Sequence, residues 1–196
     1  MPEYSNPILK EPISKEELQA LPLFDHGGRY QLIETKADAL KAVEDLKKVS
    51  LLGFDTETRP SFRKGEFYHV ALLQLASHDC CYLFRLNKIP LMREIVELLE
   101  NEAIKKVGVA IRDDVIGLQK LTSFKAAGFI DLAEKTRISK SISLSLRSLC
   151  GMYLNHRLSK GAKVTNWESP ILSESQARYA ANDAFVSLLI FEKMFI

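Results

Sequence analysis

Two acidic residues stand out because of their spacing. Asp55 and Glu57 are separated by one residue at the end of the apolar run 51–56. Side chains two positions apart on a strand point to the same face, so both carboxylates are expected to point the same way. At about 4 Å their repulsion is roughly 4 kcal/mol at an effective dielectric of 20, and a bound cation would relieve it. Taken alone, such a pair also fits a solvated loop just past a strand.

A third candidate is one of two adjacent aspartates. In a helix that follows residue 109, Asp114 shares a face with Leu118 and Leu121, whereas Asp113 shares its face with Gly117. The pattern predicts that Asp114 points inward and that Asp113 is a helix cap or solvated. The alternative is that both aspartates merely begin the helix.

The fourth carboxylate interrupts the apolar stripe of the last predicted helix. Asp183 shares this stripe with Tyr179, Val186 and Ile190. A buried aspartate is usually paired, bound to metal or neutral, and the nearby Arg178 faces another way. By itself, the pattern fits a structural role and a functional role equally well.

Together the four acids form an oxygen-only set of candidate ligands. Such ligands suit the hard ions Mg²⁺ or Mn²⁺ rather than zinc, which prefers nitrogen and sulfur. The four histidines show no HExxH or related spacing, and the sequence contains no Walker A run, GxGxxG or GxSxG motif. The chemistry that remains is metal-assisted reaction at a phosphate.

The elements that would position these acids alternate along the chain. Strand patterns cover residues 30–33, 51–56, 70–76, 80–84, 106–109 and 129–131, and helical patterns cover residues 35–48, 91–100, 114–121, 144–154 and 173–195. The three strands between residues 51 and 84 are expected to be consecutive antiparallel neighbours. This order predicts the α/β class, with a mixed β-sheet flanked by helices. We expect residues 1–28 to be an N-terminal extension and residues 29–196 to be one domain.

Composition sets few limits on function. The chain has 196 residues, 46% of them hydrophobic, and a net charge of only +2, which permits nucleic-acid binding without suggesting it. The three cysteines, Cys80, Cys81 and Cys150, form neither a disulfide framework nor a metal-binding spacing. No leader-like or membrane-spanning stretch is present. We therefore expect a soluble, cytoplasmic protein.

Three sequence motifs resemble those of a known family. They are Phe54-Asp55-Thr56-Glu57, then the run from Val107 to Asp114, then Tyr179-Ala180-Ala181-Asn182-Asp183. In order and spacing they resemble the exonuclease motifs of the DEDDy 3′-5′ exonucleases of the ribonuclease H-like superfamily, over about residues 30 to 195. Within the family, the exonuclease domain of the Werner-syndrome helicase looks most similar and RNase D more distant. The resemblance implies a mixed sheet whose first three strands are antiparallel.

The resemblance also implies a role for each motif residue. Asp55, Glu57 and Asp183 would bind the first of two Mg²⁺ or Mn²⁺ ions, Asp55 would reach the second, and Asp114 would act directly or through water. Tyr179 would orient the attacking water. Residues 29–196 would then be an exonuclease domain that releases nucleoside 5′-monophosphates from nucleic acid, with DNA favoured. The alternatives are an RNase D-like enzyme that trims RNA 3′ ends, or a non-catalytic nucleic-acid-binding module.

Two basic regions could contact the nucleic-acid backbone. One is the loop 59–65, which equally fits a solvated connection. The other is a set of cations before the last helix, which equally fits a basic surface: Lys135, Arg137, Lys140, Arg147, Arg157, Lys160 and Lys163. Trp167 could stack a base, but a lone tryptophan beside a helix start is more often a packing anchor.

Overall fold

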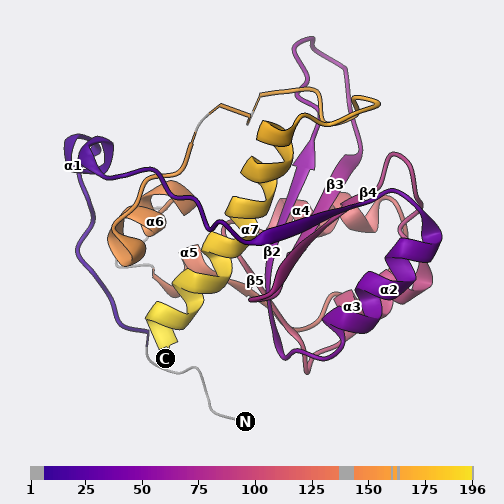
Figure 1. Ribbon diagram of the computed structural model, residues 1–196, viewed down its shortest axis with the longest axis horizontal. Helices are drawn as coiled ribbons and strands as arrows, with labels where there is room; N and C mark the ends of the chain where they lie inside the picture. Colours follow the sequence, from indigo (N-terminus) through magenta and orange to yellow (C-terminus); the bar gives the residue numbers. More distant parts are fainter. Residues whose placement is uncertain (1–6, 137–143, 160, 163, 196) are drawn as a thin grey trace.

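The computed structural model describes residues 7–136, 144–159, 161–162 and 164–195, which form a mixed sheet flanked by helices (Figure 1). The strands are β1 (Arg29–Ile33), β2 (Leu51–Thr58), β3 (Val70–Ala76), β4 (Cys80–Arg85), β5 (Lys105–Gly108) and β6 (Phe129–Asp131). The helices are α1 (Lys15–Ala20), α2 (Lys36–Leu46), α3 (Arg93–Glu100), α4 (Arg112–Gln119), α5 (Leu132–Lys135), α6 (Leu146–Leu154) and α7 (Glu174–Phe195). The α/β class predicted from the sequence is confirmed.

The strands form one six-stranded sheet in the order β1-β4-β3-β2-β5-β6. β2, β3 and β4 are antiparallel neighbours, as expected, whereas β1 joins β4, β5 joins β2 and β6 joins β5 in parallel. The register places Asp55 directly opposite Gln74 of β3. β2 therefore lies inside the sheet, where its neighbours hold it on both sides.

The helices divide between the two faces of the sheet. On one face, α2 and α3 pack through residues such as Val43, Leu46 and Leu99 against Phe54 and Leu73. On the other face, the long helix α7 lies across the strands, with α6 packed against it (Figure 1). Leu52 and Phe54 of β2 are buried toward the first face, so by strand alternation Gly53 and Asp55 point toward α7.

The N-terminal segment is more ordered than its sequence predicted. It contains the helix α1, whose capping box joins Ser14 and Glu17. Beyond α1 the backbone of Phe24 donates a hydrogen bond to the carbonyl oxygen of Arg157, and Ile8 donates to that of Met194. The prediction missed α1 because its apolar residues are few. No helix in the described ranges has the length and apolarity needed to cross a bilayer.

Candidate active site

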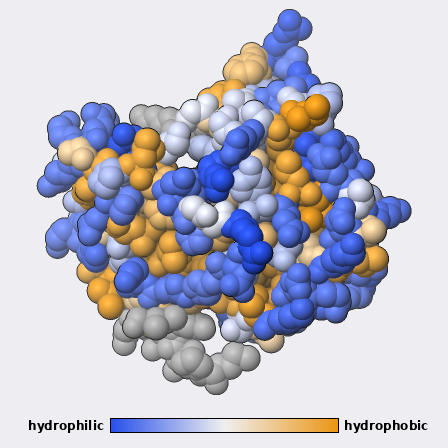
Figure 2. Space-filling view, viewed as in Figure 1, coloured by the Kyte–Doolittle hydropathy of each residue, from blue (hydrophilic) through white to orange (hydrophobic). Residues whose placement is uncertain are grey.

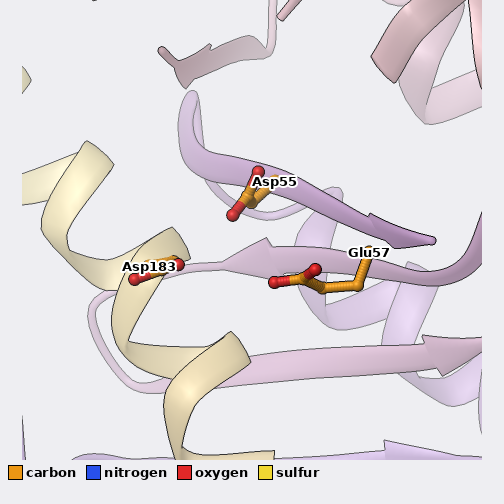
Figure 3. A group of neighbouring side chains, drawn as sticks. All are labelled: Asp55, Glu57 and Asp183. Atoms are coloured by element: carbon orange, nitrogen blue, oxygen red, sulfur yellow. The ribbon is translucent and has the colours of Figure 1, made fainter. Parts of the chain in front are cut away.

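Three of the four predicted acids lie together. Asp55 and Glu57 come from β2 and Asp183 from the middle of α7, and one carboxylate oxygen of each lies within 4.8 Å of the others (Figure 3). Asp183 is only 6% exposed, and the other two are half-buried. β2 extends to Thr58, so Glu57 belongs to the strand rather than to a loop after it. The alternation expected for Asp55 and Glu57 therefore directs both toward α7.

A glycine allows α7 to approach β2 so closely. A Cβ atom at Gly53 would lie 1.9 Å from the carbonyl oxygen of Ala184, so no larger residue fits there without moving the helix. The helix face over this strand is itself made of small buried residues, including Ala180 and Ala181. Sequence reasoning missed Gly53, although a glycine inside a strand often marks a close backbone approach.

Tyr179 lies one helical turn before Asp183 and shares its surroundings. Its hydroxyl makes a side-chain hydrogen bond to Asp183. Burial, followed by the negative charges of Asp183 and Glu57, raises the pKa of Tyr179 far above its usual value. The phenol is therefore a protonated donor at neutral pH. Its ring lies 6.2 Å from that of Trp167, which is fully buried and confirms the prediction of a packing anchor.

The acids and Tyr179 line an open hollow of about 400 Å³. Its other walls include Ala110 from the β5–α4 turn, Ser159, and Arg147 from α6. Arg147 is the one cationic residue among those that line this hollow. Its Nη1 atom is buried and makes no hydrogen bond within the described part of the chain. A guanidinium in the wall of a hollow is suited to an anionic group that enters that hollow.

Asp114 is not part of the three-carboxylate group. It accepts a hydrogen bond from the hydroxyl of Thr56, and alternation along β2 places Thr56 on the face opposite Asp55. It lines a hollow with Tyr68 that borders the acidic hollow at Thr56, and burial raises its pKa. The expectation that Asp114 is less exposed than Asp113 is confirmed, because Asp113 is exposed in the first turn of α4.

The β5–α4 turn is held by a residue that sequence reasoning did not single out. Asp131 accepts hydrogen bonds from the backbone nitrogens of Ala110 and Ile111, at 3.0 and 3.2 Å, and also caps α5 through Ala133. Ala110 has a φ of 58°, which is unfavourable for a residue with a Cβ atom. Asp131 thus stabilises a strained turn in the wall of the acidic hollow.

Among the basic residues predicted before α7, the three that the structure describes have different surroundings. Arg157 donates from Nε to the carbonyl oxygen of Leu21 and so anchors the N-terminal segment, while Lys135 is exposed. Arg137, Lys140, Lys160 and Lys163 lie outside the described residues. Within the described ranges, only Arg147 of this set lines the acidic hollow.

The chemistry of the three-carboxylate group fits a divalent cation. It offers only oxygen ligands, and three neighbouring carboxylates repel one another unless a cation or proton intervenes. The protonated phenol of Tyr179 and the guanidinium of Arg147 add a proton donor and an anion-binding group on the same hollow. The arrangement is suited to reaction at a phosphate.

Comparisons with known proteins point to the same chemistry. The family model described as 3′-5′ exonuclease matches residues 30–195. The chain is 33% identical over 184 residues to the bifunctional 3′-5′ exonuclease/ATP-dependent helicase WRN of Mus musculus, a match that covers 89% of the chain and 13% of that protein. It is 36% identical over 150 residues to exonuclease 3′-5′ domain-containing protein 2 of Drosophila melanogaster, covering 74% of the chain and 25% of the relative. The chain thus spans a quarter or less of these two relatives.

Solved structures agree with the fold. The Nibbler EXO domain of Aedes aegypti has a TM-score of 0.74 at 25% identity, covering 89% of this chain and 90% of that one. RNase D of Escherichia coli has a TM-score of 0.77 at 22% identity, covering 84% and 44%, and supports the fold alone. The architecture is that of the ribonuclease H-like exonucleases, as the motifs implied. The chain belongs to the 3′-5′ exonuclease family.

Proposed function

We propose that this chain is a divalent-metal-dependent 3′-5′ exonuclease of the DEDDy group. It would hydrolyse the terminal phosphodiester of a nucleic acid, with DNA favoured, and release nucleoside 5′-monophosphates. The observation that supports this is the meeting of Asp55, Glu57 and Asp183 within 4.8 Å, beside the protonated phenol of Tyr179. Membership of the family supports the same reaction.

The acids would hold Mg²⁺ or Mn²⁺, and we propose two ions as in two-metal phosphodiester hydrolysis. When bound, such ions acidify water and neutralise charge on the phosphate oxygens. Asp55, Glu57 and Asp183 would hold one ion, and Asp55 would also serve the second; their closeness within 4.8 Å supports this. If Asp114 helps to hold the second ion, its side chain must either give up the hydrogen bond from Thr56 or bind the ion through a water molecule.

Two further side chains would handle the substrate itself. The hydroxyl of Tyr179 stays protonated and lies beside Asp183, so it can orient the attacking water. Arg147 lines the hollow, and its planar guanidinium would bind a non-bridging phosphate oxygen after a side-chain rotation that exposes the buried Nη1. Both groups line the same hollow as the acids, which is where the terminal phosphodiester would lie.

Two alternative functions were considered for this site. An RNase D-like activity on RNA 3′ ends is the second candidate, because the three carboxylates and Tyr179 could act on a phosphodiester of either DNA or RNA. A non-catalytic binding module is disfavoured, because three carboxylates and the tyrosine are all present in one site.

The domain boundary at residue 29 and a cytoplasmic location stay predictions. Free, buried Cys80, Cys81 and Cys150 are compatible with that location.

One assay tests the activity and separates the substrates. Single-stranded DNA, recessed duplex DNA and RNA, each labelled at the 5′ end, are incubated with Mg²⁺ or Mn²⁺. We expect a ladder of shortened DNA that EDTA abolishes. Asp55→Ala and Asp183→Ala should be inactive, whereas Asp79→Ala, an exposed aspartate in the β3–β4 turn, should be fully active. Absence of degradation of all three substrates with both ions would overturn the proposed function.

A further inference from the structure

Three hollows adjoin one another along one side of the protein. The acidic hollow shares Ser159 and Tyr179 with a second hollow of about 540 Å³. The second shares Asn166 with a third, of about 520 Å³. Because each hollow has a wall residue in common with the next, the three lie next to one another in a series that begins at the acids. We call this series the strand groove.

The far end of the strand groove combines an aromatic side chain with cations. Arg59, Phe62 and Arg63 of the β2–β3 loop form one wall together with Glu66 and Tyr68, and Val164 and Asn166, which precede α7, form the other. Phe62 is 78% exposed, so its ring is accessible to a ligand in this hollow. Figure 2 shows hydrophobic and hydrophilic side chains interleaved at the upper end of the molecule, where Figure 1 places the β2–β3 loop.

The two walls are joined to each other and anchored to the sheet. Arg59 forms an ion pair with Glu168 at 3.3 Å and lies over the ring of Tyr68, 4.5 Å from its centroid. The buried Arg85 of β4 donates to the carbonyl oxygen of Ser169 at 2.5 Å, which fixes the second wall to the sheet. The third hollow is therefore shaped before any ligand enters it, and an occupant need not order both walls.

The middle of the strand groove is polar. Its walls carry hydroxyl and amide groups, including Ser159, Thr165, Asn166, Gln176 and Asn182, and one cation, Arg178. Gln176 already donates to Thr165 at 2.9 Å, and Arg178 donates to the carbonyl oxygen of Gly28, so these walls are internally supported. Uncharged donors and acceptors of this kind suit a sugar-phosphate backbone rather than an apolar ligand.

We propose that the strand groove holds the unpaired segment of nucleic acid that lies 5′ of the scissile phosphodiester, with a base stacked on Phe62 and phosphates beside Arg59 and Arg63. Exposed aromatic rings between cations are the usual means of binding single strands without sequence preference. A base inside a duplex has both faces covered by its stacked neighbours, so the surface selects unpaired nucleotides. The inference rests on the proposed function, because that reaction places the 3′ end of the strand at the acids.

The loop itself supplies matched control residues. Phe67 is 92% exposed and Lys64 is exposed, but neither lines the third hollow, whereas Phe62 and Arg63 do. We therefore compare Phe62→Ala with Phe67→Ala, and Arg63→Ala with Lys64→Ala. All four changes are on exposed loop positions, so they should leave folding intact, which circular dichroism and thermal melting check.

The test uses a 5′-fluorescent 15-nucleotide strand, as DNA and as RNA, and a dinucleotide too short to reach Phe62. For the 15-mer, Phe62→Ala and Arg63→Ala should each lower kcat/KM about tenfold, mainly by raising KM, while the controls stay within about twofold. Cleavage of the dinucleotide should be unchanged in all four variants. Equal losses in Phe67→Ala and Phe62→Ala, or no loss in Phe62→Ala, would overturn the proposal.

Direct binding separates this proposal from the proposed function. Fluorescence anisotropy of the 15-mer in EDTA measures the surface without turnover. If the natural protein degrades nothing yet binds the strand, and Phe62→Ala loses binding while Phe67→Ala keeps it, the activity proposal fails and the strand groove stands. If a blunt duplex competes as well as the unlabelled single strand, the selection of unpaired nucleotides is wrong. Comparison of the DNA and RNA arms decides which strand is preferred.

Discussion

The carbonyl oxygen of Ala184 packs directly onto the α-carbon of Gly53, so closely that a Cβ at residue 53 would lie 1.9 Å from it. This contact sets the distance between β2 and α7. Asp55 lies two residues after Gly53 on the same face of the strand, and Asp183 immediately precedes Ala184. The spacing of the three acids therefore depends on a residue that has no chemistry of its own.

Replacement of Gly53 by alanine should damage stability and activity together. The added methyl group meets backbone rather than a flexible side chain, so α7 must move, at a cost of about 2 to 3 kcal/mol. We expect a lower urea midpoint and a large loss of nuclease activity. Gly161→Ala is the control for stability alone, because its nearest contact would be an ordinary 3.5 Å and the residue lines the second hollow. A fully active, fully stable Gly53→Ala protein would show that the close approach is unimportant.

Asp183→Asn should separate stability from metal binding. Removing one of three clustered carboxylates relieves their mutual repulsion. In EDTA the melting temperature should therefore rise, by about 2–4 °C for each kcal/mol added to the free energy of unfolding. Mn²⁺ should raise the melting temperature of the natural protein but scarcely that of the variant. The readout is thermal melting with and without Mn²⁺. An undiminished Mn²⁺ effect in Asp183→Asn would argue against this residue as a ligand.

Tyr179→Phe should slow turnover and leave metal binding intact. The hydroxyl that would orient the water is lost, whereas the three carboxylates remain. We expect kcat to fall roughly 10- to 100-fold with the Mn²⁺-dependent rise in melting temperature preserved. Tyr153→Phe, whose hydroxyl donates to the carbonyl oxygen of Ile8 far from the acids, serves as the control. Loss of the Mn²⁺ effect in Tyr179→Phe would mean that the phenol supports the metal site itself.

Asp114 and Asp113 make a second matched pair. If Asp114 serves the second ion, Asp114→Ala should lose activity by about 100-fold, while Asp113→Ala should stay near the natural rate because that side chain is exposed. Thr56→Val removes the hydroxyl that Asp114 contacts and should preserve activity better than Asp114→Ala does. Initial rates at saturating Mn²⁺ are the measurement. An active Asp114→Ala together with an inactive Asp113→Ala would reverse the assignment.

Lys106 should make stability depend on pH. Its Nζ donates to the carbonyl oxygens of Leu98, Asn101 and Ile104, while burial and then the charge of Lys105 lower its pKa to about 8. The unfolded chain keeps this proton up to about pH 10.5, so between these values the unfolded state binds more protons.

The free energy of unfolding should therefore rise with pH between about 8 and 10.5 by on the order of 1 to 3 kcal/mol, relative to Lys106→Met. Urea melts of both proteins at pH 7.5 and pH 10 measure the difference and cancel the effect of other titrating groups. Parallel pH curves for the two proteins would show that Lys106 does not lose its proton in this range.

Local periodicity determined much of this site from the sequence. Alternation along β2 predicts that Asp55 and Glu57 share a face, and the helical repeat predicts that Tyr179 lies one turn before Asp183. Both predictions are confirmed because each relation lies within one element, where backbone geometry sets side-chain direction. The antiparallel pairing of β3 with β4 was predictable for a similar reason, because only residues 77–79 connect the two strands.

Relations between elements were decided only by the tertiary structure. How closely α7 approaches β2 depends on Gly53 against Ala184, and no periodicity within either element specifies that distance. The contact of Asp114 with Thr56 and the support of the β5–α4 turn by Asp131 likewise join residues from separate elements. The strand groove also needs two loops brought together across the fold. Such contacts depend on packing, which fixes distances that sequence spacing leaves open.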